Sequence, residues 1–279
     1  MENQIKYSKT LADFLKEDKS KYPNTLNELL EFCVGKFAGL PFVSKAFEPP
    51  LTFREFFDRV LSIADLLVER GVKKGDRVAI LGENSPHWGI SFFATVRVGA
   101  LAVPILPDFP DADIRHILSD SESKVLFTTY KQWEKISGPE LDQIRSRTIL
   151  KHVIMLDDFD EAAHKTKMES FTDIFNRALD FIKKIPETIG LTSRAAAEND
   201  VASIIYTSGT SGHSKAVQLT HKNLVSNVIA GSLSANMAPG DICLSILPLS
   251  HCYEFTLGFL LPLLMGARIV SLGNPPTPS

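Results

Sequence analysis

The 279-residue chain is long enough to bury one large domain or two small ones. Its 44% hydrophobic and 23% charged residues are ordinary for a globular protein, and a net charge of −3 gives no reason to expect nucleic-acid binding. Three cysteines without metal-ligand spacing suit a reducing compartment and the polar N-terminus is not a signal peptide, so we expect a soluble, cytoplasmic protein.

The first half of the chain predicts alternating helices and strands. Residues 52–70 form an amphipathic pattern that Thr52 and Glu55 begin as a capping box and Gly71 ends. Further helices are predicted over 85–98 and 111–119, and strands over 77–81, 100–105, 125–129 and 152–156. This alternation predicts a mainly parallel sheet covered by helices.

The region from Lys131 to Asp200 is polar, and we expect it to form a connecting lobe. One helix is predicted within it, with its apolar face at Ile174, Phe175, Ala178, Leu179 and Ile182.

A loop rich in glycine and hydroxyl side chains follows the apolar strand predicted over 201–206. Its unblocked backbone N–H groups, its hydroxyl donors and Lys215 are the groups that hold a polyphosphate. Ser214 precedes Lys215 and Ala216 follows it, so the loop is not a Walker A sequence. A flexible linker is the alternative, but the strand predicted over 216–219 argues against it.

Thr220 is a candidate N-cap for a helix running to about Leu233. If the strand over 216–219 returned toward the loop, the dipole of this helix would add favourable potential for phosphate.

The loop resembles the phosphate-binding signature of the adenylate-forming superfamily, which contains acyl-CoA synthetases, luciferases and the adenylation domains of peptide synthetases. Ser214 replaces the usual proline and Ala216 the usual glycine of this signature. The resemblance implies ATP-phosphate binding by the residues that match, which are Thr207, Ser208, Gly209, Thr210, Ser211, Gly212 and Lys215.

Three further segments resemble motifs of the same superfamily in the same order, namely 51–55, 98–104 and 247–254. In the last of these, the His-x-x-Glu pattern is similar to long-chain acyl-CoA synthetases. The resemblance implies that His251, Tyr253 and Glu254 border the nucleotide and acyl sites. A core position for His251, and a structural role for Glu254 at a helix end or beside a basic group, are the alternatives.

The resemblance also implies the fold: α/β, the large N-terminal domain of the superfamily, with sheets flanked by helices. The later motifs Tyr-Gly-x-Thr-Glu and Ser-Gly-Asp do not occur, and neither does the small C-terminal domain. We therefore expect residues 1–279 to be a truncated, partial AMP-binding domain that is inactive alone.

By the same resemblance, the parent protein is an AMP-forming long-chain fatty-acid–CoA ligase that uses ATP, Mg²⁺ and CoA. Alternatives are a ligase for an aryl or medium-chain acid, transfer to an acyl carrier protein, and a non-catalytic nucleotide- or acyl-binding module. No catalytic residue is assigned. No metal ligand is assigned either, since Asp108, Asp111 and Asp113 flank a helix start, where aspartate is favoured.

The apolar run from Leu257 to Ala267 is too short to span a bilayer. Core packing explains it, and the resemblance implies instead that one face lines the acyl tunnel. A long-chain substrate partitions into bilayers, which leaves peripheral membrane contact open.

Overall fold

The computed structural model describes residues 22–157, 169–170, 196–207 and 215–272. Its larger sheet has seven strands in the order β7-β6-β5-β3-β4-β8-β9. Only the β8–β9 pair is antiparallel, which confirms the predicted mainly parallel sheet. The strands are β3 (Arg77–Leu81), β4 (Leu101–Ile105), β5 (Ser123–Thr128), β6 (His152–Met155), β7 (Glu169–Ser170), β8 (Val201–Thr207) and β9 (Lys215–Thr220).

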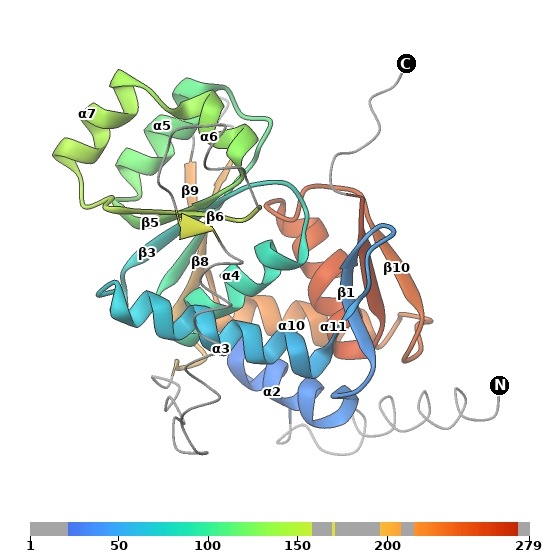
Figure 1. Ribbon diagram of the computed structural model, residues 1–279. Helices are drawn as coiled ribbons and strands as arrows, with labels where there is room; N and C mark the ends of the chain where they lie inside the picture. Colours follow the sequence, from blue (N-terminus) through green and yellow to red (C-terminus); the bar gives the residue numbers. More distant parts are fainter. Residues whose placement is uncertain (1–21, 158–168, 171–195, 208–214, 273–279) are drawn as a thin grey trace.

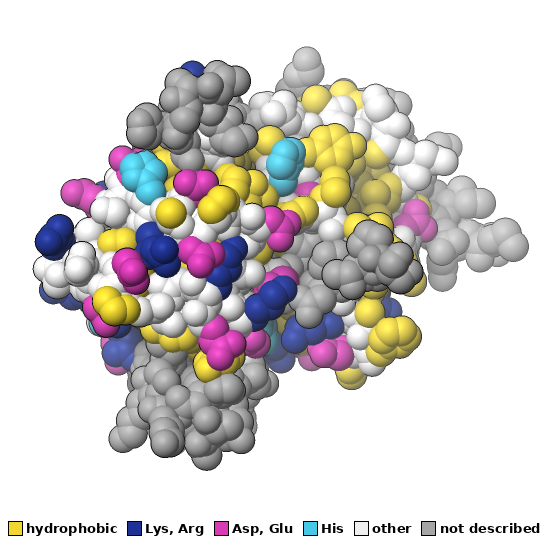
Figure 2. Space-filling view, turned by 90° about the horizontal axis from the view of Figure 1, so that it is seen from above, with side chains coloured by type: hydrophobic (Ala, Val, Ile, Leu, Met, Phe, Trp, Pro, Cys, Tyr) yellow, Lys and Arg dark blue, Asp and Glu magenta, His cyan; other side chains and the backbone are white. Residues whose placement is uncertain are grey.

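Helices cover both faces of this sheet (Figure 1). One face carries α5 (Asp111–Asp120), α6 (Tyr130–Ile136) and α7 (Pro139–Arg147), and the other carries α3 (Phe53–Glu69) and α4 (Pro86–Arg97). Basic and acidic side chains are interspersed over the α5–α7 side of the molecule (Figure 2). This mixture of signs is typical of a solvated surface and not of a nucleic-acid-binding patch.

A second, four-stranded sheet joins the two ends of the described chain, in the order β10-β11-β1-β2. Its strands are β1 (Pro41–Lys45), β2 (Leu51–Thr52), β10 (Ile242–Ser245) and β11 (Arg268–Ser271). β1 pairs in parallel with β11, so that Val43 lies opposite Ile269. β2 is antiparallel to β1, so both sheets are mixed and flanked by helices, as the fold prediction required.

The capping box of α3 confirms the predicted start of this helix. The Thr52 hydroxyl accepts the Glu55 N–H at 3.1 Å, and Glu55 Oε2 accepts the Thr52 N–H at 2.8 Å. The Thr52 hydroxyl also donates to Glu55 Oε2 at 2.9 Å, and the two hydrogen bonds that Thr52 donates to this carboxylate lower the pKa of Glu55. Gly71 follows the helix with a φ of +76°, which a glycine adopts without strain.

The prediction of a connecting lobe from Lys131 onward is wrong for residues 131–157. This segment forms the rest of α6, then α7 and β6, and the buried side chains of Ile136, Leu141 and Leu150 join the core under α5. Its polar composition reflects the exposed outer faces of α6 and α7. The helix expected around residues 174–182 lies outside the described residues.

The β8–β9 hairpin corrects the expected role of the following helix. α10 (His221–Ser232) begins directly after Thr220, whose hydroxyl caps it, and Thr220 lies opposite Val201 at the start of β8. The hairpin loop lies at the other end of β9, roughly 17 Å away at ~3.4 Å per strand residue. The N-terminus of α10 is therefore too far from the loop to stabilise phosphate there.

The apolar run near the end of the chain forms a π-helix, η2 (Glu254–Leu260), continued by α11 (Leu261–Met265). Phe259 is fully buried among the rings of Phe42, Phe56, Phe93 and Phe255. The run is thus mostly core, with Leu257 left partly exposed. In the described part of the chain, every helix is too short or too polar to cross a membrane.

His221, the first residue of α10, ties this helix to α2 (Leu26–Phe37). The buried imidazole accepts the Leu26 N–H at Nδ1, with a distance of 3.2 Å. Burial lowers the pKa of His221 to about 4, although the Asp200 and Glu28 carboxylates oppose this shift; Lys74 reinforces it. Between pH values of about 4 and 6.5, His221 is therefore neutral in the folded protein and protonated in the unfolded chain.

We expect stability to fall as the pH drops from about 6.5 to about 4, because only the unfolded chain binds the His221 proton in this interval. The full loss is about 3 kcal/mol of unfolding free energy. Urea unfolding across this pH range measures it. His221→Asn keeps an acceptor for Leu26 without titrating, so this variant should lose less stability; an equal loss would contradict the assignment.

Candidate functional site

The predicted phosphate loop connects β8 to β9 at one edge of the larger sheet. Thr207 ends β8 and Lys215 begins β9; the two residues are paired across the hairpin, and both are exposed. Ser208, Gly209, Thr210, Ser211 and Gly212 lie outside the described residues. Ala216 sits opposite Tyr206 in the antiparallel ladder, where strand backbone suits alanine as well as glycine.

Strand alternation sets the direction of the side chains that lead into this loop. The Tyr206 hydroxyl donates to Asp120 Oδ2 at 2.7 Å, at the end of α5. Burial, followed by the Asp120 carboxylate, raises the pKa of the Tyr206 phenol. Ile205 and Thr207 therefore point to the opposite face of β8, where they line a pocket.

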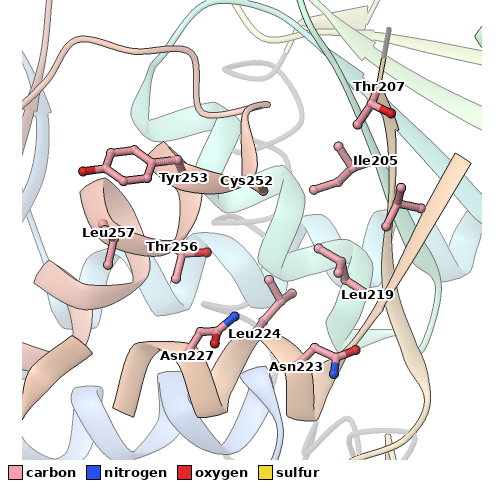
Figure 3. Close-up of a pocket in the computed structure, with 11 residues that line it drawn as sticks. Ile205, Thr207, Leu219, Asn223, Leu224, Asn227, Cys252, Tyr253, Thr256 and Leu257 are labelled. Carbon is pink, nitrogen blue, oxygen red and sulfur yellow. The ribbon is translucent and has the colours of Figure 1, made fainter. Parts of the chain in front are cut away.

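This pocket has a volume of about 500 Å³ (Figure 3). The β8–β9 hairpin, α10 and the start of η2 form its walls, and Thr207 stands at its border next to the hairpin loop. The volume is within the ~300–1,000 Å³ range of small-molecule sites. The lining residues are Ile205, Thr207, Val217, Leu219, Asn223, Leu224, Asn227, Cys252, Tyr253, Thr256 and Leu257.

The walls of the pocket differ in polarity. Aliphatic side chains come from both strands of the hairpin, from α10 and from η2. Asn223 and Asn227 lie one turn apart on α10 and add two amides, and Thr256 adds a hydroxyl from η2 (Figure 3). Such a pocket accommodates an apolar body with a few hydrogen-bonding groups.

The three border residues take different positions in the structure. Tyr253 lines the pocket. His251 is exposed beside it, with Nδ1 accepting the Tyr253 N–H at 3.3 Å, so a core position for His251 is wrong. Glu254 is buried and accepts the Ser245 hydroxyl at 2.8 Å, so a solvated helix end is wrong. Within the described residues this carboxylate makes a structural hydrogen bond and forms no ion pair with a basic side chain. Burial raises the pKa of the Glu254 carboxyl.

Sequence reasoning missed two components of this site. Asn223 and Asn227 carried a signal, since their i, i+4 spacing on a predicted helix places them on one face. The sequence signal for Asn84 was weaker. This residue follows the carboxyl end of a parallel strand, where ligand sites of α/β sheets gather, and it contacts the segment that leads to His251.

Residues 36–279 match the family model described as AMP-binding enzyme. Fatty acyl-CoA synthetase A of Dictyostelium discoideum is 30% identical over 209 residues, which are 73% of this chain and 30% of that protein. A long-chain-fatty-acid–CoA ligase of Salmonella typhimurium is 26% identical over 269 residues, which are 90% of this chain and 47% of that protein. This chain thus spans less than half the length of either relative.

The fold also matches a solved structure. An inhibitor-bound crystal structure of the N-terminal domain of FACL13 from Mycobacterium tuberculosis superposes with a TM-score of 0.69 and 24% sequence identity. The match covers 90% of this chain and 57% of that chain. At this identity the likeness establishes the arrangement of sheets and helices, which agrees with the predicted large N-terminal domain.

Proposed function

The chain belongs to the AMP-binding enzyme family, and from that premise we propose that the full-length protein activates a long-chain fatty acid with ATP and transfers it to CoA. Family membership supports adenylate formation by an acyl-activating enzyme. The long-chain acid, CoA as the acceptor and the residues that contact them are what we propose in addition.

The observation that carries the proposal is that the apolar pocket and the phosphate loop share Thr207. A fatty acid in the pocket would present its carboxylate at the hairpin end, where the loop would hold the phosphates of ATP. Positioning of this kind supplies much of the rate of a reaction between two bound substrates.

The chemistry needs no protein nucleophile. The carboxylate oxygen attacks the α-phosphorus of ATP, the bond to the β-phosphate oxygen breaks, and pyrophosphate leaves. A thiol then attacks the acyl carbon and AMP leaves with the electron pair of the broken C–O bond. Lys215 and the Thr207 hydroxyl would stabilise the negative charge on the phosphates.

Magnesium fits this site as an ion carried by ATP. No group of three or more His, Cys, Asp or Glu side chains gathers among the described residues. Magnesium commonly binds through substrate phosphates, water and only one or two protein oxygens, and the Thr207 hydroxyl is available as one of these. When bound, the ion would supply charge neutralisation on the phosphates.

The amides in the pocket support a second candidate substrate. Asn223 and Asn227 would leave hydrogen-bonding groups unused against a plain alkyl chain. An acid with a polar or aryl group would use them, and an acyl carrier protein could replace CoA as the acceptor. Comparing acids of different length and polarity separates these candidates.

Replacing Leu257 with tryptophan tests the pocket directly. Leu257 lines the pocket from η2, and the larger ring should occupy volume that a long acyl chain needs. We expect kcat/KM for palmitate to fall about tenfold or more, with a smaller change for hexanoate. Acid-dependent adenylation kinetics of the full-length variant measure both values.

Leu233→Trp is the matched control. Leu233 is an exposed leucine at the end of α10 that does not line the pocket, so its replacement should leave both acids unaffected. Equal losses for palmitate and hexanoate in Leu257→Trp, or no loss for either, would contradict placement of the acyl chain in this pocket.

A further inference from the structure

The turn between β3 and α4 contacts a segment more than 160 residues away through one side chain. Asn84 is 8% exposed, and its Nδ2 donates to Ser245 Oγ at 2.9 Å and to the Leu247 carbonyl at 2.7 Å. Its Oδ1 accepts the Leu249 N–H at 2.8 Å. Both donors and one acceptor position of the amide are therefore used on this segment.

The contact continues through Ser245 to the π-helix. Ser245, the last residue of β10, donates its hydroxyl to Glu254 Oε1 at 2.8 Å, and Glu254 is the first residue of η2. Asn84, Ser245 and Glu254 thus connect the two ends of the intervening segment, residues 246–253. We call this segment the pocket loop.

The geometry around Glu254 leaves little freedom. A Cβ on Gly258 would lie 2.5 Å from the Glu254 carboxyl carbon, so any larger residue at position 258 would require this carboxylate to move. η2 is a π-helix, a conformation that is rare and concentrated at functional sites.

Most residues of the pocket loop are exposed. Ile246 and Leu247 are about half exposed, and His251, Cys252 and Tyr253 are exposed, whereas Leu249 and Ser250 are buried. Two hydrogen bonds with the Asn84 side chain, at the Leu247 carbonyl and the Leu249 N–H, hold the first half of the loop. A backbone hydrogen bond from the His251 N–H to the Pro248 carbonyl holds the turn that follows. Cys252 and Tyr253, at the end of the loop, form one wall of the pocket (Figure 3).

We propose that Asn84 is a positioning residue for the acid: by holding the pocket loop, it sets the wall formed by Cys252 and Tyr253 and thereby the affinity for the acyl chain. The catalytic relevance of this inference rests on the proposed function. Within the described residues the Asn84 side chain hydrogen-bonds to Ser245, Leu247 and Leu249 and not to the hairpin that carries Thr207 and Lys215, so the affinity for ATP should not depend on Asn84.

Asn84→Ala in the full-length protein tests the proposal with two measurements. Hydrogen exchange of the Leu249 amide should accelerate about tenfold or more, because this N–H loses its acceptor. The KM for palmitate should rise about tenfold, while the KM for ATP changes less than about twofold. A general loss of stability would not separate the two substrates in this way.

Asn27→Ala is the matched control. Asn27 is also a buried asparagine whose Nδ2 donates to a backbone carbonyl, that of Val96, but it lies on α2 and not in the pocket. Its replacement should leave Leu249 exchange and both KM values near those of the wild type. If Asn84→Ala fails to fold, Ser245→Ala tests the positioning role in its place. The KM for palmitate should then rise about threefold.

Each outcome has a defined meaning. If hydrogen exchange of the Leu249 amide were unchanged in folded Asn84→Ala, the inference that Asn84 holds the pocket loop would be overturned. Faster exchange with an unchanged KM for palmitate, or equal rises in both KM values, would overturn the positioning role. If the wild-type protein activates no acid, the proposed function fails and the positioning role fails with it, whereas the exchange measurement still decides whether Asn84 holds the pocket loop.

Discussion

Replacing Lys215 with alanine is expected to lower kcat/KM for acid-dependent adenylation by about 10²–10³-fold. Lys215 is the first residue of β9 and is paired with Thr207, at the end of the hairpin where the phosphates of ATP are proposed to bind. Negative charge builds on the departing pyrophosphate, and loss of a preorganised cation there has a cost comparable to loss of an oxyanion-hole donor. Steady-state kinetics of the full-length variant measure the change.

Lys222→Ala serves as the control for Lys215. Lys222 is an exposed lysine on the neighbouring α10, where it pairs with Glu198 at 2.8 Å. A surface pair of this kind contributes little, so activity and stability should stay near the wild-type values. Wild-type adenylation by Lys215→Ala would show that this lysine is a surface residue with no part in phosphate binding.

Replacing Phe259 with alanine is expected to lower the free energy of unfolding by about 3–5 kcal/mol. The ring is 1% exposed and joins the π-helix to α3, α4 and β1 through neighbouring aromatic rings. Urea unfolding measures the loss. Phe47→Ala, at a fully exposed phenylalanine, should change stability by less than about 0.5 kcal/mol.

Gly89 provides a second test of the same contact. A Cβ on Gly89 would lie 2.5 Å from Phe259 Cζ, so Gly89→Ala should destabilise the wild type through overpacking. In the Phe259→Ala background, the same change should be tolerated, because the ring is gone and alanine is the better helix former. Additive effects of the two substitutions would contradict the contact.

Local signals in the sequence were sufficient for much of the larger sheet. The capping box at Thr52 and the glycine stop at Gly71 placed α3 to within one residue at each end. The alternation of strands and helices from Arg77 to Met155 predicted a mainly parallel sheet, because strands joined through helices pair in parallel; it did not predict the order of the strands. These features depend on residues close together in the chain.

Features made by distant residues could not be predicted in the same way. In the second sheet, β1 pairs with β11, which lies more than 220 residues further along the chain. The sequence pattern of a short strand does not indicate which distant strand it pairs with. The β8–β9 hairpin determined that α10 starts far from the loop, which the apolar pattern of β9 left undecided. The hydrogen bonds of Asn84 span a comparable distance.

Within the candidate site, the residue types could be predicted from the sequence, whereas their arrangement depends on the fold. Tyr253 lines the pocket, and its contact with an acyl substrate stays a prediction. Glu254, two residues after the exposed Cys252, is turned inward to Ser245 instead. Phosphate binding by Thr207 and Lys215 stays a prediction, as it does for residues 208–212.

The most direct test of the proposed function is acid-dependent ATP–pyrophosphate exchange by the full-length protein. The acids should run from acetate to palmitate and include aryl acids. We predict exchange that requires an acid and rises with chain length, because the pocket beside Thr207 is largely aliphatic. No exchange with any acid, from protein shown to be folded, would contradict acyl-adenylate formation and favour a non-catalytic nucleotide- or acyl-binding module.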